Sequence, residues 1–155
     1  MTEQRTTDQR TTPQRTATGP VGTVVDRFLE AVAAANIADA TDLYAADATL
    51  DLVVPNWRAS VSGEAAIRAE YGRWFADPGS FEEMTRSTTS DGEVVEYTLS
   101  WMEHGVPHGA RHVHVLRIDR TVDRIVGDHV WCGGRWPASL LAEMGAVVTA
   151  SSVAS

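Results

Sequence analysis

Apolar side chains recur at helical spacing in two stretches of the first half of the chain. Over residues 21–36 they fall at i, i+3, i+4, i+7, i+8 and i+11, which predicts an amphipathic helix with Thr23 as its N-cap. Over residues 63–76 the same period predicts another helix, capped by Ser62. A short helix is expected to begin at Asp39, between these two.

Alternation with period two indicates strands in most of the remaining chain. A first strand is expected over residues 49–54, ended by Pro55. Longer strands are expected over residues 81–89, 93–103, 111–118 and 124–132. The tripeptide at 90–92, Ser-Asp-Gly, is a hairpin turn signal. Helices followed by a run of antiparallel strands predict an α+β fold, with helices packed on one face of a curved sheet.

The last two strands carry a cluster of imidazoles. If residues 121–122 form the turn, residues whose numbers sum to 243 face each other. His114 is then opposite His129 and His112 is opposite Trp131, all on one face. Apolar groups interrupted by titratable imidazoles are typical of a small-molecule pocket, because burial tunes histidine across neutral pH. The structural alternative is a set of core histidines hydrogen-bonded to their neighbours.

Extending the alternation to residues 93–103 adds aromatic walls to this face. If these residues pair with residues 111–118 so that the numbers of facing residues sum to 213, Trp101 lies opposite His112, and Tyr97 lies on the same face. Glu96 then lies opposite Arg117 on the other face. A two-residue turn at 91–92 brings Arg86 to the pocket side as well. There Arg86 either contacts an anion or covers apolar surface at the rim.

The opposite face of the sheet is too apolar for solvent alone. Val113, Val115 and Val130 lie there among charged residues that include Asp128, and this predicts a homodimer through the outer sheet face. Cys132 is expected to be a packed thiol on the same face. A last helix over residues 138–144, ended by Gly145, either closes the core or swaps onto a dimer partner.

Composition limits the function classes. With 155 residues, 43% of them hydrophobic, the chain suits one domain, expected over residues 21–148 between a disordered tail at 1–20 and a flexible tail at 149–155. The net charge is −8 and all 13 basic residues are scattered arginines, which argues against nucleic acid. A single cysteine and the lack of an 18-residue apolar run favour a cytoplasmic protein without a membrane partner.

Two stretches resemble a known family. Residues 43–52 (LYAADATLDL) and 62–68 (SGEAAIR), with the order of elements, resemble the SnoaL-like branch of the nuclear transport factor two-like superfamily, over residues 21–136. The resemblance implies a cone-shaped α+β barrel with N-terminal helices packed on a curved sheet. The superfamily includes polyketide cyclases, ketosteroid isomerases, limonene epoxide hydrolases, scytalone dehydratases and non-catalytic binding domains, so the fold alone does not define the chemistry.

The resemblance to ketosteroid isomerases implies which residues of this chain stand at their catalytic positions. Phe28 stands at the position of the oxyanion tyrosine, Leu52 at that of the base carboxylate and His114 at that of the protonated acid. Two of these three polar groups are therefore missing, which disfavours steroid isomerisation by that route. Asp51 is next to the lost base, and it reaches the pocket only if a bulge reverses its direction.

The resemblance to polyketide cyclases implies a cofactor-free general acid/base enzyme of the cyclase, isomerase or dehydratase type. Its expected substrate is a hydrophobic oxygenated small molecule, such as a polyketide or terpenoid intermediate. His114 is expected to be the general base or acid, with His129 and Asp51 as further catalytic candidates. The expected substrate-binding residues are His112, Tyr97, Trp101, Trp131, Trp57, Arg86, Phe28 and Leu52.

Two alternatives stay open. The same cavity suits a non-catalytic ligand-binding or scaffold domain, which free imidazole nitrogens facing the cavity would argue against. A metal site is the other, because His112 and His114 project to one side of a strand and His129 offers a third ligand. The expected site holds neither cofactor nor metal.

Overall fold

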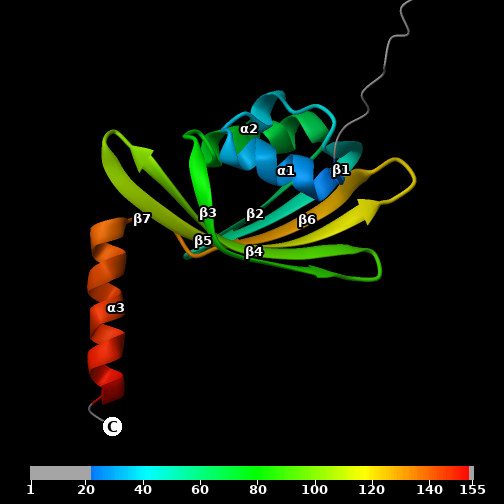
Figure 1. The fold of residues 1–155 in the computed structure, drawn as a ribbon. Coiled ribbons are helices and arrows are strands. Elements are labelled where there is room, and N and C mark those ends of the chain that lie inside the picture. The colour runs from blue at the N-terminus through cyan, green and yellow to red at the C-terminus, as the bar shows by residue number, and fades with distance from the viewer. Residues whose placement is uncertain (1–21, 154–155) are drawn as a thin grey trace, which may run out of the picture.

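The computed structural model describes residues 22–153, and the tail expected at 1–20 lies outside this range (Figure 1). Helices α1 (Val24–Ala33) and α2 (Glu64–Trp74) and the 3₁₀ turn η1 (Ile37–Asp39) cover one face of a curved sheet. The strands are β1 (Tyr44–Val54), β2 (Trp57–Ser62), β3 (Gly79–Thr88), β4 (Gly92–Glu103), β5 (Val106–Asp119), β6 (Arg124–Cys132) and β7 (Trp136–Pro137). Helix α3 (Ala138–Val153) projects away from the sheet. The predicted α+β class, with helices on one sheet face, is confirmed.

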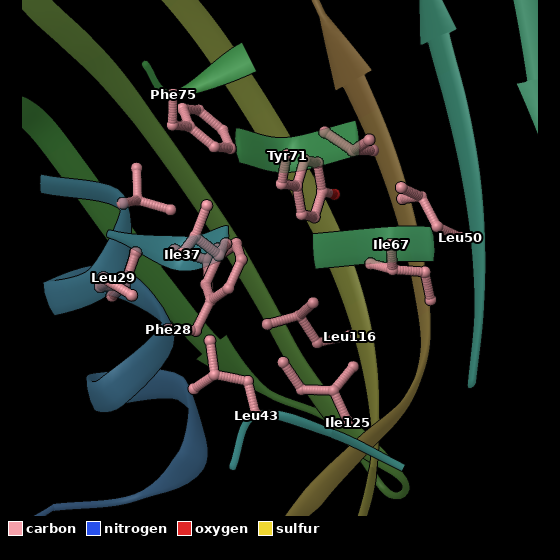
Figure 2. Close-up of a cluster of buried hydrophobic side chains, with 14 of the residues drawn as sticks. Phe28, Leu29, Ile37, Leu43, Leu50, Ile67, Tyr71, Phe75, Leu116 and Ile125 are labelled. Atoms are coloured by element: carbon pink, nitrogen blue, oxygen red, sulfur yellow. The ribbon is translucent and has the colours of Figure 1, made fainter. Parts of the chain in front are cut away.

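The sheet order is β2-β1-β6-β5-β4-β3, and β7 pairs with β5. Strands β1 and β6 are parallel, while the other pairs are antiparallel. The core lies between the helices and the inner sheet face, as Figure 2 shows for side chains that include Phe28, Ile67, Tyr71 and Leu116. A cavity is therefore expected only where the helices leave this inner face uncovered.

The two main helices form where the apolar period predicts them. Thr23 caps α1 in a capping box with Asp26, and the apolar stripe is buried. Helix α2 begins after Gly63, whose φ of +93° suits glycine, and not directly after Ser62. The helix expected at Asp39 is wrong: the chain enters β1 at Tyr44, because backbone pairing with β6 overrides the local helical period.

A bulge in β6 makes the predicted pairing of His114 with His129 wrong. Next to the turn, Ile118 faces Ile125 at the predicted sum of 243. The ladder shifts at Val126, after which His114 faces Val130 at a sum of 244. One extra residue reverses every later side chain of the strand. Asp128, Val130 and Cys132, expected outside, are therefore inside, whereas His129 and Trp131 are outside.

The predicted pairing of β4 with β5 is also wrong, by four positions. Strand β5 begins at Val106, and His104 and Gly105 form a two-residue turn with positive φ at both positions. With this turn, the numbers of facing residues in β4 and β5 sum to 209, so Glu96 faces Val113 and not Arg117. Because four is an even number, the inner and outer faces of β4 stay as predicted.

The C-terminal helix differs from its prediction. It runs through Gly145 to Val153, so residues 149–153 belong to it, and it leaves the body of the protein instead of closing the core (Figure 1). None of the helices in the described part of the chain has the length and apolarity needed to cross a membrane.

Candidate functional site

An apolar cavity of about 390 Å³ opens at the end of the inner sheet face beyond α2. The end of α2 contributes Trp74 and the adjoining Phe75, while β4 contributes Leu99 and Trp101. The other walls are Val54, Trp57, Ala110, His112, Cys132, Gly134 and Arg135. A cavity of this size with few polar groups is suited to a small, mostly apolar molecule.

His112 is the imidazole of the cavity wall. Its side chain is 3% exposed, and its Nδ1 is buried without a hydrogen-bond partner among residues 22–153. Burial, and secondarily the neighbouring His114, lowers the pKa of His112 to about 3, against the weaker opposing effect of the Ala110 backbone. The ring is therefore neutral at pH 7, and it has both an N–H donor and a basic nitrogen.

A buried polar network lies behind His112. The Nδ1 of His114 is 3.1 Å from an oxygen of Asp128, and its Nε2 is 3.0 Å from the hydroxyl of Tyr97. Because a carboxylate only accepts, Nδ1 carries the proton, and Tyr97 donates to Nε2. Burial raises the pKa of Tyr97 well above its ordinary value, which keeps that proton in place.

Two more tyrosines hold the Asp128 carboxylate. The hydroxyl of Tyr71, on α2, donates to it at 2.6 Å, and that of Tyr44, on β1, at 3.3 Å. Burial and the Asp128 charge raise the pKa of both hydroxyls, so they remain donors. With His114 the carboxylate has three donors, which compensates for its burial. The network therefore fixes the rings of Tyr97 and His114, and His112 packs against both at 5.3 and 6.1 Å between centroids.

Polar contacts hold Trp101 at the cavity wall. His108 stacks on its ring at 5.8 Å, and the Arg135 guanidinium lies 5.0 Å from the ring centre. Glu103 accepts from the indole of Trp101 at 3.1 Å and from Arg135 at 2.5 Å. These two bonds, the indole first, lower the pKa of Glu103. The cation of Arg135 is thus paired within the wall.

Cys132 also lines the cavity, as the cross-strand neighbour of His112, so its predicted place on the outer face is wrong. Burial raises the pKa of the thiol, and the Gly134 amide donates to its sulfur at 3.4 Å. A thiol that holds its proton is a packing group and a weak nucleophile.

Several residues expected in the pocket lie on the outer sheet face. His129 and Trp131 stack there at 3.9 Å between ring centroids, and Asp51 accepts a hydrogen bond from Ser60. Asp51 and His129 are register partners beside a hollow of about 220 Å³, which Arg117 also lines. The Nε2 of His129 is buried there without a partner among the described residues. None of these side chains lines the inner cavity.

The other candidates are on the inner side at different depths. Trp57, Trp101 and His112 line the cavity. Phe28, Leu52, Tyr97 and His114 are fully buried in the core. Arg86 lies at the far end of the sheet, where it pairs with Glu93 and Asp26, and does not line the cavity. The predicted contact with a ligand anion therefore has no support at Arg86.

The metal alternative depends on His129 joining His112 and His114, but the bulge puts His129 on the other face. Both nitrogens of His114 are within hydrogen-bond distance of Asp128 and Tyr97. No three ligand-type side chains come together to hold a metal within the described range.

Sequence reasoning missed Asp128, Tyr71 and Tyr44 as members of the polar network, and Trp74, Phe75 and Arg135 as cavity walls. The alternation in the sequence places Asp128 on the outer face, and only the bulge brings it next to His114, so the sequence carries no signal for this contact. The Tyr71 signal was present in its position on the buried stripe of α2, where a polar hydroxyl needs a partner.

The helices on a curved sheet, with a cavity at one end of its inner face, define a nuclear transport factor two-like α+β cone. The chain belongs to the family of proteins with a SnoaL-like domain, whose model matches residues 25–131. Of the curated proteins compared with the chain, none matches it.

Solved structures agree on the fold. A protein with a ketosteroid isomerase-like fold from Catenulispora acidiphila, in complex with trimethylamine, is 19% identical with a TM-score of 0.54, over 71% of this chain and 85% of that one. An NTF-2 like protein from Burkholderia xenovorans is 20% identical with a TM-score of 0.55, over 71% and 80%. The epoxide hydrolase/cyclase-like enzyme SalBIII, of pyran ring formation in the polyether salinomycin, is 15% identical with a TM-score of 0.57, over 71% and 88%.

Proposed function

We propose that the protein is a cofactor-free enzyme that transfers protons on a hydrophobic, oxygen-bearing small molecule, as an isomerase, cyclase or dehydratase does. The observation that carries this proposal is the His112 imidazole, a buried titratable group in the wall of an apolar cavity. Its Nδ1 has almost no accessible surface, so a ligand oxygen in the cavity would hydrogen-bond the ring through Nε2.

The chemistry follows from a neutral imidazole. With a pKa of about 3, His112 is a weak general base at pH 7. Its N–H is well suited to hydrogen-bond a carbonyl oxygen and to stabilise the negative charge that develops there. Water or hydroxide from solvent at the cavity mouth takes the proton of the adjacent carbon, and solvent then returns a proton to the same carbon. The apolar walls strengthen this interaction by excluding water. His112 is thus the proposed catalytic residue, and Tyr97 and His114 are positioning residues that fix its ring from behind.

The cavity also suits the polyketide or terpenoid class expected from the sequence. Three tryptophans and Phe75 give flat apolar walls, with His112 as the polar group set among them. A fused-ring ketone could bury its rings against these walls and direct one oxygen to His112.

The reaction class can be tested with a model ketone, without knowledge of the natural substrate. 2-Tetralone, a bicyclic ketone with enolisable C–H bonds, is incubated with the protein in D₂O, and deuterium incorporation is followed by proton NMR. We expect exchange about 100-fold faster than with His112→Phe, the usual size of acid–base assistance. His129→Phe makes the same change on the outer sheet face and should exchange at the wild-type rate.

Tryptophan fluorescence, read in the same samples, separates catalysis from binding. 2-Tetralone could quench the tryptophan fluorescence of the wild-type protein while its deuterium exchange is no faster than with His112→Phe. This result would support the second candidate, a non-catalytic binding domain with the same cavity. Equal rates in all three proteins, with saturable quenching, would refute the enzymatic proposal. The Trp57 side chain, 55% exposed at the cavity wall, provides the signal.

The homodimer through the outer sheet face stays a prediction. Val115 and Trp131 are exposed there beside the charged Asp51 and Arg117, a mixture that a two-fold interface could pair. Trp131→Glu tests this face, because a charge at its centre would dissociate such a dimer.

A further inference from the structure

Helix α3 is the least covered apolar element of the structure. Its 16 residues include one charged side chain, Glu143, and apolar residues occur all round its circumference instead of along one stripe. Leu141 is 39% exposed and Met144 is 54% exposed. A helix that is apolar on all sides is normally buried, so the exposed state of α3 in a single chain requires a further surface.

The protein's own body does not provide that surface. Helix α3 begins at Ala138, directly after β7, and β7 is paired with β5 through His108 and Gly109. No linker lies between the strand and the helix, and the helix points away from the sheet, as Figure 1 shows. Near that root, the space at Gly109 lets the Leu141 side chain approach β5.

A hollow of about 530 Å³ lies beside the same root. Its walls include Ala138 itself, the exposed Met102, and Trp101 with its stacking partner His108. Helix and hollow are therefore adjacent at the end of strands β3 to β5. A two-fold axis near Ala138 would carry the α3 of each copy to the hollow of the other, and both surfaces would be covered at once.

We propose that α3 is an exchange arm that packs into this hollow on a second copy of the chain. Trp101 lines both the hollow and the cavity, so the partner's arm supports the wall of the site from outside. A 16-residue helix is about 24 Å long, and burying half of its circumference covers roughly 380 Å². Two arms and the surfaces that they cover make about 1,500 Å², the size of a stable interface.

The charge of the chain favours a protein partner over a lipid surface. The net charge is −8 and α3 has no basic residue, whereas interfacial helices usually carry lysine or arginine on one face. The arm has no polar face on which such a helix would depend.

Light scattering of the full chain, with four variants, tests the exchange. We expect a dimer, whose dissociation constant rises at least about tenfold in Met144→Glu and in Met102→Glu, because a charge then enters an apolar contact. Val122→Glu places the same change at a turn where the side chain is 57% exposed, and it should leave the dimer intact. Trp131→Glu separates this contact from the outer sheet face, since it would dissociate only a dimer formed through that face. A monomer, or a dimer lost only in Trp131→Glu, would overturn the proposal.

Cross-linking distinguishes the exchange from pairing of two α3 helices. In a Cys132→Ala background, Met144→Cys and Met102→Cys chains are prepared separately, mixed and oxidised. We expect a disulfide-linked dimer in the mixture and little in either sample alone. Efficient linkage of Met144→Cys chains alone would mean that the helices pair with each other, and no linkage in the mixture would mean that the arm lies elsewhere. Either result would refute the proposal.

Discussion

Tyr71→Phe removes one hydroxyl from the centre of the polar network and little else. The hydroxyl donates to Asp128 at 2.6 Å, and both side chains are buried. The ring keeps its packing against Phe75 and Phe28, whose centroids lie 5.4 and 6.1 Å away. The variant therefore measures the hydrogen bond and not the loss of apolar volume.

The expected cost follows from the geometry. Hydrogen bonds to charged groups contribute about 1.5–3 kcal/mol, and no solvent replaces the donor at a buried carboxylate. We expect Tyr71→Phe to lower the free energy of unfolding by about 2 kcal/mol. Tyr44→Phe is the matched control, because it removes a donor to the same oxygen at 3.3 Å, where the bond is weaker. Its cost should be about 1 kcal/mol or less.

Urea unfolding followed by circular dichroism measures both values. The slope against urea should be unchanged, since neither variant alters the surface exposed on unfolding. A loss below about 0.5 kcal/mol for Tyr71→Phe, or a larger loss for Tyr44→Phe, would show that Asp128 does not depend on the short bond.

Two further predictions concern backbone space and pH. A Cβ at Gly92 would overlap the carbonyl oxygen of Leu116, so Gly92→Ala should cost more than about 2 kcal/mol in urea unfolding. At Gly127 it would meet only the flexible end of Arg117, and Gly127→Ala should cost less than about 1 kcal/mol. The pKa of His112 is about 3 in the folded protein, against an ordinary value of 6.5 for histidine. The unfolded chain therefore takes the proton first, and stability should fall from about pH 6.5 towards pH 3, by up to about 1.4 kcal/mol per unit. Unfolding at pH 7 and pH 4.5 should show a smaller loss in His112→Phe than in the wild type.

The helices, and the sheet face to which the side chains of β4 point, were predictable because each depends on a local period of apolar residues. The stripe of α1 and the Thr23 cap specify that helix within one turn. The face of Tyr97 and Trp101 was also correct, since an error of four residues in register preserves the direction of every side chain.

The site was less predictable because it depends on two irregularities. Val126 has no feature that marks it as a bulge, yet it exchanges His129 for Asp128 as the neighbour of His114. The turn at His104 and Gly105 requires positive φ at a histidine, which propensity does not favour. The burial of Asp128 follows from tertiary donors on α2 and β1, and no local pattern encodes them.

The NMR spectrum of the His112 imidazole tests the central claim most directly. In ¹⁵N-histidine-labelled protein, the His112 signal is the one lost in His112→Phe, provided that the other signals stay in place. We predict that this imidazole stays neutral from pH 7 to about pH 4, as its low pKa requires, and that its nitrogen shifts change when 2-tetralone binds. Titration near pH 6.5, or nitrogen shifts that do not respond to a ligand that quenches tryptophan fluorescence, would contradict the account.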